Sequence, residues 1–498
     1  MKRKTITHPD YAWLRMNAPN NLMVVTGVMI FDAPLDYPRF KATIEQRLLV
    51  FKRFRQRLVT PKTPFTRPYW EDDPAFDLDR HLQHIQLPIP DGQATGDQRA
   101  LLDTVGAYMS VELDYDHPLW QFYLIESYAE GSAFIARLHH SIADGISLMQ
   151  VLLYLTDATP DAPLAGKPLV PTQSDEAPAQ TLKSAALNSA RWSAKTFWQE
   201  GGKMIRHPSR AVHLARQAVD FSASVASLVF RRPDPKTLFK GPLGLEKRAV
   251  LSEPIPLQDV KDIAKTFNGK VNDVLLTAAA GALGRYLEGR GQAPKDLSIR
   301  SFVPINLRPI QLDEELGNKF GMVFLSLPLG ITDPVERLGR VKQNMDAIKS
   351  SYDPVSTYAV IHLLGATPAW VEGIAVGLFD SKGSLIITNV PGPQHQLYLA
   401  GMPIKLAMAW VPQSGRIAVG VSIFSYNGNV WVGIATDQSL VPDPERLLEL
   451  FQAEYDELLK RARAIQAERQ KVVQPMLEML EEDVQALDEL LAKGKDGQ

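Results

Sequence analysis

One stretch around residue 140 constrains the fold more than any other part of the sequence. Residues 132–136 form a short apolar, β-favouring run, and the segment Arg-Leu-His-His-Ser-Ile-Ala-Asp-Gly follows at 137–145. Residues 146–153 then place apolar side chains at helical spacing. The pattern predicts a strand that leads through a tight loop into a helix.

His139 and His140 are candidates for chemistry at this turn. Successive residues of a strand point to opposite faces, so if the strand runs through both histidines only one of them can enter a given pocket. Asp144 lies four residues past His140, and Gly145 allows a sharp backbone turn at close quarters. This arrangement suits one imidazole held as a general base while a carboxylate fixes the loop. A surface pair that scavenges metal ions is the simpler alternative.

The spacing His-His-x-x-x-Asp-Gly resembles the motif of the CoA-dependent acyltransferase superfamily, which includes chloramphenicol acetyltransferase and the condensation domains of peptide synthetases. Within it, the chain resembles the bacterial wax ester synthase/acyl-CoA:diacylglycerol acyltransferase family. Further motifs occur in the family's order between about residues 5 and 455. They are Asp10-Tyr11-Ala12-Trp13-Leu14, Pro118-Leu119-Trp120, Asn272-Asp273, Asn389-Val390-Pro391-Gly392-Pro393 and Ser425-Tyr426-Asn427-Gly428. One departure is Asn21-Leu22-Met23, where the family usually has Pro-Met-His.

The resemblance implies an α/β fold of two chloramphenicol-acetyltransferase-like domains joined by a helical crossover linker, with the active site in a channel between them. It assigns the general base to His140 rather than His139, and it makes Asn272 an active-site amide for a developing oxyanion. The catalytic residues it implies are His140, Asp144, His139, Gly145 and Asn272. The substrate-binding residues it implies are Pro118, Leu119, Trp120, Asp273, Asn389, Pro391 and Gly392. It also implies a structural ion pair between Asp144 and Arg308.

Simpler roles exist for three of these motifs. An Asn or Asp at 272–273 is a good N-cap for the helix that follows. A tryptophan such as Trp120 more often packs in a core than contacts a substrate. The Pro391–Pro393 loop can serve chain reversal alone, and Asn427-Gly428 is a type I′ turn signal between two strands.

The length of 498 residues exceeds one ordinary core, so two domains are expected. Residues 157–179 are rich in proline, which is typical of a linker, and residues 182–232 are basic and helix-prone. The expected divisions are an N-terminal acyltransferase domain (1–175), a basic helical linker (176–240), a C-terminal acyltransferase domain (241–460) and a helical tail (461–498).

Composition excludes several classes of function. Lys and Arg number 54 against 56 Asp and Glu, a net charge of −2 that carries no nucleic-acid signature. The absence of cysteine excludes disulfides, thiolate metal sites and a cysteine nucleophile, and it fits a reducing cytoplasm. The basic N-terminus lacks the apolar run of a signal peptide. No Walker loop, dinucleotide fingerprint or metal site is recognisable, so no cofactor or metal is expected and acyl-CoA enters as a substrate.

Two segments bear on membranes. The apolar stretch from Tyr358 to Phe379 is long enough to span a bilayer, but His362, Pro368 and Glu372 interrupt it, which favours a buried or interfacial helix pair. The basic, aromatic-bearing segment 182–232 can lie in a membrane interface or pack as a crossover connection.

The function expected from the resemblance is transfer of a long-chain acyl group from acyl-CoA to a fatty alcohol or to diacylglycerol, which yields wax ester or triacylglycerol. No covalent acyl-enzyme is required. The expected setting is cytoplasmic, with peripheral contact to a membrane or lipid droplet, no nucleic-acid partner and an open oligomeric state. Two alternatives remain: an acyltransferase for an amine, peptide or glycolipid acceptor, and a non-catalytic lipid-surface protein. The intact His-His-x-x-x-Asp-Gly and Asn-Asp motifs argue against the latter.

Overall fold

The computed structural model describes most of the chain, and its secondary structure is mixed α/β. The described residues are 3–62, 66–89, 91, 95–129, 131–164, 230–292, 295–307, 316–349, 357–358, 360–362 and 369–495. Most of the predicted linker (176–240), up to residue 229, lies outside them, as does Arg308.

Helices and strands alternate irregularly along the described chain. The helices are α1 (His8–Arg15), α2 (Tyr37–Thr43), α3 (Leu78–His81), α4 (Gln98–Met109), α5 (Gly145–Leu155), α9 (Leu257–Thr266), α10 (Val271–Gly289), α11 (Pro334–Lys349), α13 (Ala369–Asp380) and α14 (Pro444–Lys495). The strands are β1 (Lys4–Thr5), β2 (Val24–Phe31), β3 (Gln56–Val59), β4 (Tyr69–Asp72), β5 (Leu82–Ile85), β6 (Trp120–Tyr128), β7 (Gly131–His139), β8 (Lys247–Leu251), β9 (Ile255–Pro256), β10 (Ser298–Asn306), β11 (Phe320–Pro328), β12 (Leu385–Pro391), β13 (Tyr398–Leu399), β14 (Met402–Trp410), β15 (Val419–Tyr426) and β16 (Asn429–Asp437).

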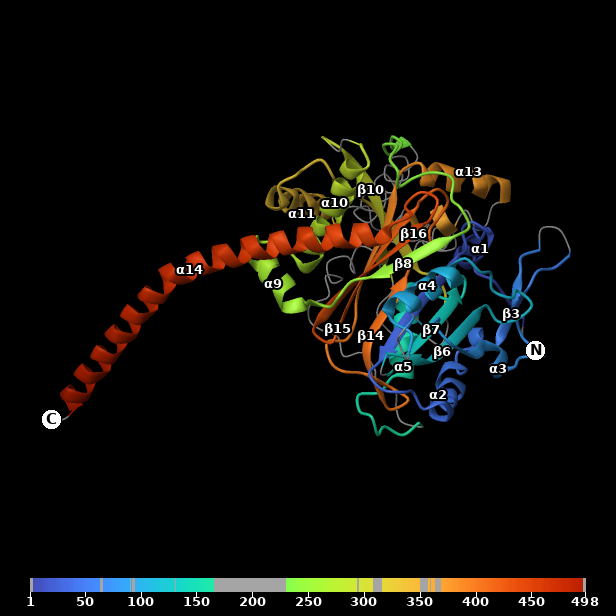
Figure 1. Cartoon of the computed structure of the whole chain (residues 1–498), viewed down its shortest axis with the longest axis horizontal. Helices are drawn as coiled ribbons and strands as arrows, with labels where there is room; N and C mark the ends of the chain where they lie inside the picture. The colour runs from blue at the N-terminus through green and yellow to red at the C-terminus, as the bar shows by residue number, and fades with distance from the viewer. Residues whose placement is uncertain are drawn as a thin grey trace, which may run out of the picture.

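Two large sheets organise the molecule (Figure 1). The N-terminal sheet has the strand order β13-β14-β2-β7-β6-β5, and the C-terminal sheet has the order β11-β10-β12-β15-β16-β8, with β9 paired to β16. A small third sheet joins β1, β4 and β3. Each large sheet carries its own cluster of buried apolar residues, which confirms the predicted two-domain α/β architecture.

Local sequence signals account for the start of several helices. Asp36, Asp97 and Asp144 each stand immediately before a helix, and each side chain accepts the backbone N–H three residues further on. Such caps satisfy a donor that the helix itself leaves without a partner, and each contributes about 1 kcal/mol. The position of α5 behind the two histidines therefore follows from Asp144.

The strand predicted before the histidines is confirmed, and it is the second strand of a hairpin. Strands β6 and β7 pair antiparallel, and β7 ends at His139, so His140 already belongs to the turn. At the start of β7 a Cβ on Gly131 would lie 2.1 Å from the carbonyl oxygen of Phe31, so only glycine fits. The turn predicted at Asn427-Gly428 is also confirmed: β15 and β16 meet at these two residues, with φ of 46° and 77°, as a type I′ turn requires.

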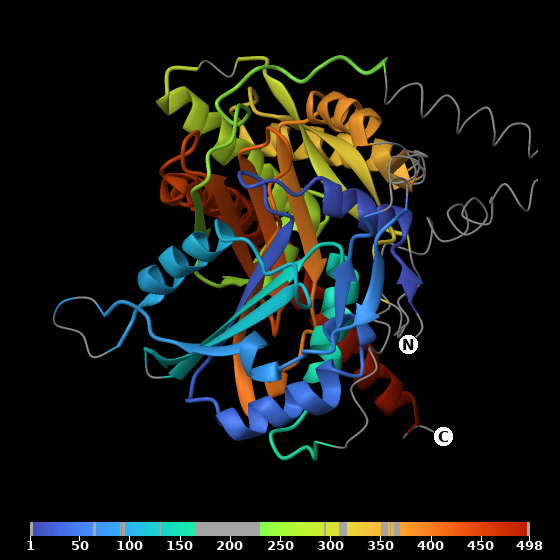
Figure 2. The ribbon, with the colours of Figure 1, turned by 90° about the vertical axis from the view of Figure 1, so that its right-hand side faces the viewer.

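One strand crosses the predicted domain division. β14 belongs by sequence to the C-terminal half, yet it pairs antiparallel with β2 in the N-terminal sheet (Figure 2). Its last residue, Trp410, is fully buried and donates from Nε1 to the carbonyl oxygen of Val250 in β8. The two halves are therefore joined by a shared sheet as well as by surface contact.

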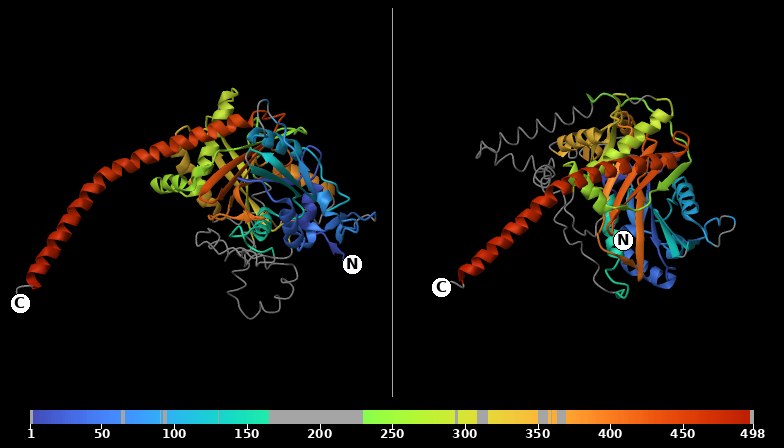
Figure 3. Two further views of the ribbon diagram at one scale, coloured as in Figure 1. Left: turned by 60° about the horizontal axis from the view of Figure 1, so that its bottom comes forward. Right: turned by 60° about the vertical axis from the view of Figure 1, so that its left-hand side comes forward.

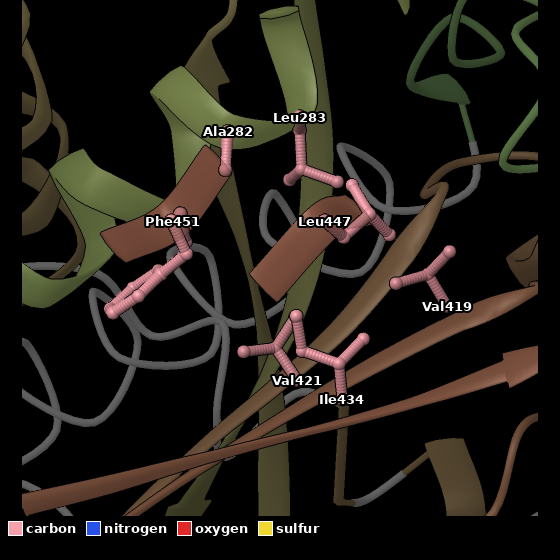
Figure 4. A pocket seen from close by; sticks show the side chains of 8 residues that line it. Ala282, Leu283, Val419, Val421, Ile434, Leu447 and Phe451 are labelled. Atoms are coloured by element: carbon pink, nitrogen blue, oxygen red, sulfur yellow. The ribbon is translucent and has the colours of Figure 1, made fainter. Parts of the chain in front are cut away.

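The C-terminal core is closed by α10 and α14, which pack against each other and against the sheet. Figure 4 shows Ala282 and Leu283 of α10 meeting Leu447 and Phe451 of α14 above the strand residue Val421. The void between these side chains is only about 10 Å³, too small for more than a single water molecule. This apolar site is core packing and offers no room for a substrate.

The predicted C-terminal tail is a continuation of α14. The helix is buried against the body as far as Ala462, and its later part projects away from it (Figures 1 and 3). Val473 and Met476 on that part are 49% and 60% exposed.

The apolar stretch 358–379 is represented in the described residues mainly by α13, a helix of 12 residues. Within the parts of the chain that can be described, every helix is too short or too polar to cross a bilayer.

Candidate active site at the domain boundary

His139 is the last residue of β7 and is 1% exposed. Its Nδ1 accepts the backbone N–H of Ser141 at 3.1 Å and lies 2.8 Å from the Ser141 hydroxyl oxygen. Burial, with a smaller contribution from the neighbouring His140, lowers the pKa of His139 to about 3. The imidazole is therefore neutral at pH 7 and its one lone pair is occupied, which favours a structural role.

His140 follows in the turn, where its backbone N–H donates to the carbonyl oxygen of Met23 at 2.7 Å. Its ring stacks on the indole of Trp13, with 4.3 Å between the ring centroids and 20° between the ring planes. The ring of Phe320 is tilted relative to the imidazole, with 5.8 Å between the two ring centroids. Burial lowers the pKa of His140, and nearby Asp144 opposes this effect. The imidazole is thus neutral at pH 7, the form in which it can accept a proton.

Asp144 holds the loop at two points. Its Oδ1 accepts the N–H of Ser147 at 2.9 Å and caps α5, while its Oδ2 accepts the N–H of Lys319 at 2.8 Å. The carboxylate is 3% exposed. It therefore links the histidine loop to a helix and to the C-terminal half at once. The predicted ion pair with Arg308 involves a residue outside the described part and stays a prediction.

Gly145 does not do what its sequence position suggested. It begins α5, its φ is outside the left-handed region, and a Cβ there would meet nothing within 4 Å. The backbone and the space around Gly145 therefore do not require glycine, and the catalytic role that the resemblance implies for it stays a prediction. Asp144, which caps the helix, determines the direction of the chain at this point.

Asn318 and Asp10 complete the surroundings of His140, and sequence reasoning assigned neither a role. Asn318 Oδ1 lies 3.0 Å from His140 Nδ1, and Asn318 Nδ2 donates to Asp10 Oδ1 at 2.8 Å. Asp10 is fully buried, and burial raises its pKa while Arg53, 3.8 Å from Oδ2, opposes the shift. Local sequence patterns could not identify Asn318, because its partners His140 and Asp10 lie 178 and 308 residues away in the chain. Asp10 stands in the N-terminal motif, which was the one available signal.

Asn272 and Asn389, far apart in sequence, are brought together. Asn389 Nδ2 donates to Asn272 Oδ1 at 2.9 Å. Asn272 is the second residue of α10, and the N-cap is Lys270 rather than either motif residue. Asp273 reaches back from the third position and accepts the Lys270 N–H at 2.9 Å, so the capping role expected for this motif belongs to Asp273. Among the described residues, no hydrogen bond joins this pair to His140.

The motifs at Asn389–Pro393 and Ser425–Gly428 also meet in space. β12 runs parallel to β15 with Pro391 opposite Ser425, and the N–H of Gly392 donates to the Ser425 carbonyl oxygen at 2.8 Å. A Cβ on Gly392 would lie 2.6 Å from that oxygen. Close backbone contact therefore explains the glycine, while substrate contact by Pro391 or Gly392 stays a prediction.

The Pro118–Trp120 motif supports the histidines from the core. Trp120 is 1% exposed, donates from Nε1 to the Phe54 carbonyl oxygen at 3.0 Å and stacks on His81. The carbonyl oxygen of Leu119 accepts the N–H of His139 at 2.9 Å. Trp120 therefore packs in the core. The substrate contacts expected of Pro118, Leu119 and Trp120 stay predictions.

The fold is shared with known two-domain proteins. The wax ester synthase/diacylglycerol acyltransferase from Marinobacter aquaeolei VT8 superposes with a TM-score of 0.64 at 22% identity, covering 92% of this chain and 100% of that one. The first condensation domain of the CDA synthetase superposes with a TM-score of 0.57 at 16% identity, covering 91% and 96%. The fold class is therefore the two-domain α/β fold of the chloramphenicol acetyltransferase type.

The sequence places the chain within one family of that class. The family model described as the wax ester synthase/diacylglycerol acyltransferase catalytic domain matches residues 6–275, and the model of the WS/DGAT C-terminal domain matches residues 316–459. A Mycobacterium tuberculosis protein named as a diacylglycerol O-acyltransferase is 28% identical over 476 residues, covering 90% of both chains. The chain belongs to the wax ester synthase/diacylglycerol acyltransferase family and is an acyltransferase.

Proposed function

We propose that this acyltransferase moves a long-chain acyl group from acyl-CoA to the hydroxyl of a fatty alcohol or of diacylglycerol, with His140 as the general base. The observation that carries the proposal is the state of His140. It is a neutral imidazole in the motif loop, stacked on Trp13 and held at Nδ1 by Asn318. His139 has its lone pair occupied by the Ser141 N–H, which disfavours it as the base.

The proposed reaction needs no covalent acyl-enzyme. His140 Nε2 takes the proton of the acceptor hydroxyl while its oxygen attacks the thioester carbonyl carbon, and a C–O bond forms. The tetrahedral oxyanion then collapses, the C–S bond breaks, and the CoA thiolate leaves with the proton returned by the imidazolium. A positioned general base contributes about 100- to 10,000-fold to such a step.

In this proposal, Asn272 supplies the hydrogen-bond donor that stabilises the oxyanion. Asn389 Nδ2 donates to Asn272 Oδ1, so the remaining donor of the Asn272 amide is its own Nδ2. A preorganised amide donor in a site with little water stabilises the negative charge as it develops. Asp273 supports this arrangement by capping α10 and fixing the first turn, on which Asn272 stands.

Peripheral contact with a membrane or lipid droplet is part of the proposal because both products are water-insoluble. The basic segment 182–232 is the sequence feature behind it, and its residues up to 229 lie outside the described part. Flotation of the full chain with anionic and with neutral vesicles tests this point separately from turnover.

The test is turnover of palmitoyl-CoA, followed by free thiol release, with hexadecanol and separately with diacylglycerol. His140→Ala is compared with wild type and with His139→Asn, whose Oδ1 can still accept the Ser141 N–H. We expect activity in wild type, a loss of about 100-fold or more in His140→Ala, and retained activity in His139→Asn. Thermal unfolding of each variant verifies folding.

Two results would change the proposal. Undiminished activity in a folded His140→Ala protein would remove His140 as the base. Absence of turnover with both hydroxyl acceptors would favour an amine, peptide or glycolipid acceptor, or lipid binding without catalysis. Product ratios with the two hydroxyl acceptors offered together would rank them.

A further inference from the structure

The Asn318 side chain is held in one orientation by its neighbours. One amide atom faces two groups that can only accept hydrogen bonds: Asp10 Oδ1 and the carbonyl oxygen of His140, each at 2.8 Å. That atom must therefore be the nitrogen, Nδ2. The backbone N–H of Asn318 also donates to Asp10 Oδ1, at 3.0 Å. Rotation of the amide by 180° would direct its oxygen at two oxygens, so the orientation shown is the stable one.

This orientation determines which nitrogen of His140 carries the proton. With Nδ2 toward Asp10, the other amide atom is Oδ1, an acceptor, and it lies 3.0 Å from His140 Nδ1. A neutral imidazole has one N–H, so His140 donates from Nδ1 and keeps its lone pair on Nε2. Asn318 is 4% exposed and Asp10 is fully buried, so water does not compete readily for these contacts.

The flanking residues hold Asn318 against the histidine loop. The carbonyl oxygen of Gly317 lies 3.5 Å from the hydroxyl oxygen of Ser147, and the N–H of Lys319 donates to Asp144 Oδ2. These residues precede β11 and belong to the C-terminal half, whereas His140 and Asp10 belong to the N-terminal half. Three consecutive residues of the C-terminal half, 317–319, thus contact residues between His140 and Ser147 in the N-terminal half.

We propose that Asn318, oriented by Asp10, is a positioning residue that sets the tautomer of His140 and so makes Nε2 the base. Because Asn318 comes from the C-terminal half, contact between the two halves adds to the hydrogen bond that His140 makes with its own backbone in favouring the reactive tautomer. The catalytic part of this inference rests on the proposed function, while the tautomer itself is a property of the free protein. Partners of a histidine's second nitrogen are known to fix tautomer and ring orientation in this way.

His139 supplies an internal comparison. The backbone N–H of Ser141 is an obligatory donor and points at His139 Nδ1, which favours protonation of His139 on Nε2, an atom that is buried without a hydrogen-bond partner among the described residues. Two adjacent histidines are therefore expected to hold opposite tautomers. The difference arises from one backbone donor on His139 and, on His140, from the Asn318 amide oxygen together with a hydrogen bond to the backbone of His140 itself.

The experiment reads the tautomers directly. Full-length protein labelled with ¹⁵N-histidine is studied at pH 7.5 by long-range ¹H–¹⁵N correlation, and His139→Asn and His140→Gln variants assign the two rings. We expect His140 to be protonated on Nδ1 and His139 on Nε2. In Asn318→Leu the His140 signal should shift wholly or partly to the Nε2-protonated form, while that of His139 stays unchanged.

Kinetics provide the second readout. Asn318→Leu should lower kcat about 10- to 100-fold, as loss of such partners does elsewhere, with KM within about twofold. Asp10→Asn keeps the shape but lets the Asn318 amide turn, because a carboxamide both donates and accepts. It should produce a mixture of tautomers and an intermediate kcat. Asn344→Leu is the matched control: that amide donates to the Ser326 carbonyl oxygen in the C-terminal half, and its loss should leave both readouts at wild-type values.

The outcomes separate this inference from the proposed function. A wild-type His140 protonated on Nε2 overturns the inference, and so does a tautomer that does not change in both Asn318→Leu and Asp10→Asn. If Asn318→Leu fails to fold, the wild-type spectrum and the nearly isosteric Asp10→Asn variant still decide. Tautomers as expected, with no turnover of acyl-CoA by any acceptor, would keep the structural assignment and remove the proposed function.

Discussion

Asp144 and Lys319, 175 residues apart in sequence, are joined by a hydrogen bond of 2.8 Å from the backbone N–H of Lys319 to the Asp144 carboxylate. The second oxygen of the same carboxylate caps α5 through Ser147. One side chain therefore connects the turn after β7, the helix behind it and the strand-leading segment of the other half. The family's motif aspartate serves here to build the loop that carries His140.

The two contacts of Asp144 can be separated by substitution. Asp144→Ser should keep the cap, since serine caps helices as well as aspartate does, but its shorter side chain cannot reach Lys319. Asp144→Ala should lose both contacts and be less stable than Asp144→Ser by about 1 kcal/mol. Thermal and urea unfolding measure the difference, and kcat should fall in both variants. Equal stability of the two would show that the cap contributes nothing.

The pH dependence of the reaction follows from the burial of His140. Burial lowers the pKa of His140, and the base must be neutral, so kcat/KM should be level around pH 7 and fall toward acid. The acidic limb should have an apparent pKa below the ordinary value of about 6.5. Initial rates of thiol release between pH 5 and 8 measure it. A limb centred above pH 6.5 would contradict this prediction, and His139→Asn should leave the limb in place.

His139 should make stability depend on pH in a defined direction. Its pKa is about 3 in the folded protein and about 6.5 when unfolded. Between these values the unfolded chain binds the extra proton, so the free energy of unfolding falls as the pH is lowered from 6.5 toward 3, by up to about 1.4 kcal/mol per pH unit. His139→Asn lacks this contribution. Its stability deficit relative to wild type, from urea unfolding, should shrink by up to about 2 kcal/mol between pH 7 and pH 5.

Asn272 tests the proposed oxyanion role. Removing one preorganised donor costs about 100- to 1,000-fold in kcat, so Asn272→Ala should fall in that range with little change in KM. Asn389→Ala removes the partner that orients the Asn272 amide and should have a smaller effect. Steady-state kinetics with palmitoyl-CoA give both values. If kcat of Asn272→Ala is within threefold of the wild-type value, backbone amides rather than Asn272 stabilise the oxyanion.

A buried ion pair of the C-terminal half lies against the boundary between the two halves. Lys247 Nζ lies 2.6 Å from Asp437 Oδ2 and donates to the carbonyl oxygen of Asn20 in the N-terminal half. Lys247→Met leaves the Asp437 carboxylate buried without its partner and should cost about 3–5 kcal/mol. The double variant Lys247→Met/Asp437→Leu should recover much of the loss. Urea unfolding of wild type, both single variants and the double variant completes the cycle.

Elements encoded by near neighbours could be predicted. The β6–β7 hairpin follows from two apolar runs on either side of Gly131, and the β15–β16 turn follows from Asn427-Gly428, since few other residues accept φ > 0 twice in succession. The start of α5 follows from Asp144. In each case the paired or capping residues lie fewer than twenty positions apart in the sequence.

Gly145 shows where a local signal misled. A glycine after an acidic residue suggested a sharp turn at close quarters, yet the backbone there is an ordinary helix start with open space beside it. Whether a glycine is required depends on what approaches its Cα, and the sequence carries no information on that approach. Gly392, by contrast, meets the Ser425 carbonyl, a contact made possible only by the pairing of β12 with β15.

The sequence by itself determined the order of the motifs, and the resemblance of those motifs to a known family indicated the class of fold and His140 as the candidate base. Turn signals and motif spacing are local properties, so they can be recognised along the chain. Only the tertiary structure decided that β14 joins the N-terminal sheet and that Asn318 reaches His140. It likewise decided that Asp10 turns the Asn318 amide. Those contacts depend on how segments hundreds of residues apart pack against each other, and the burial that gives them their strength exists only once the chain has folded.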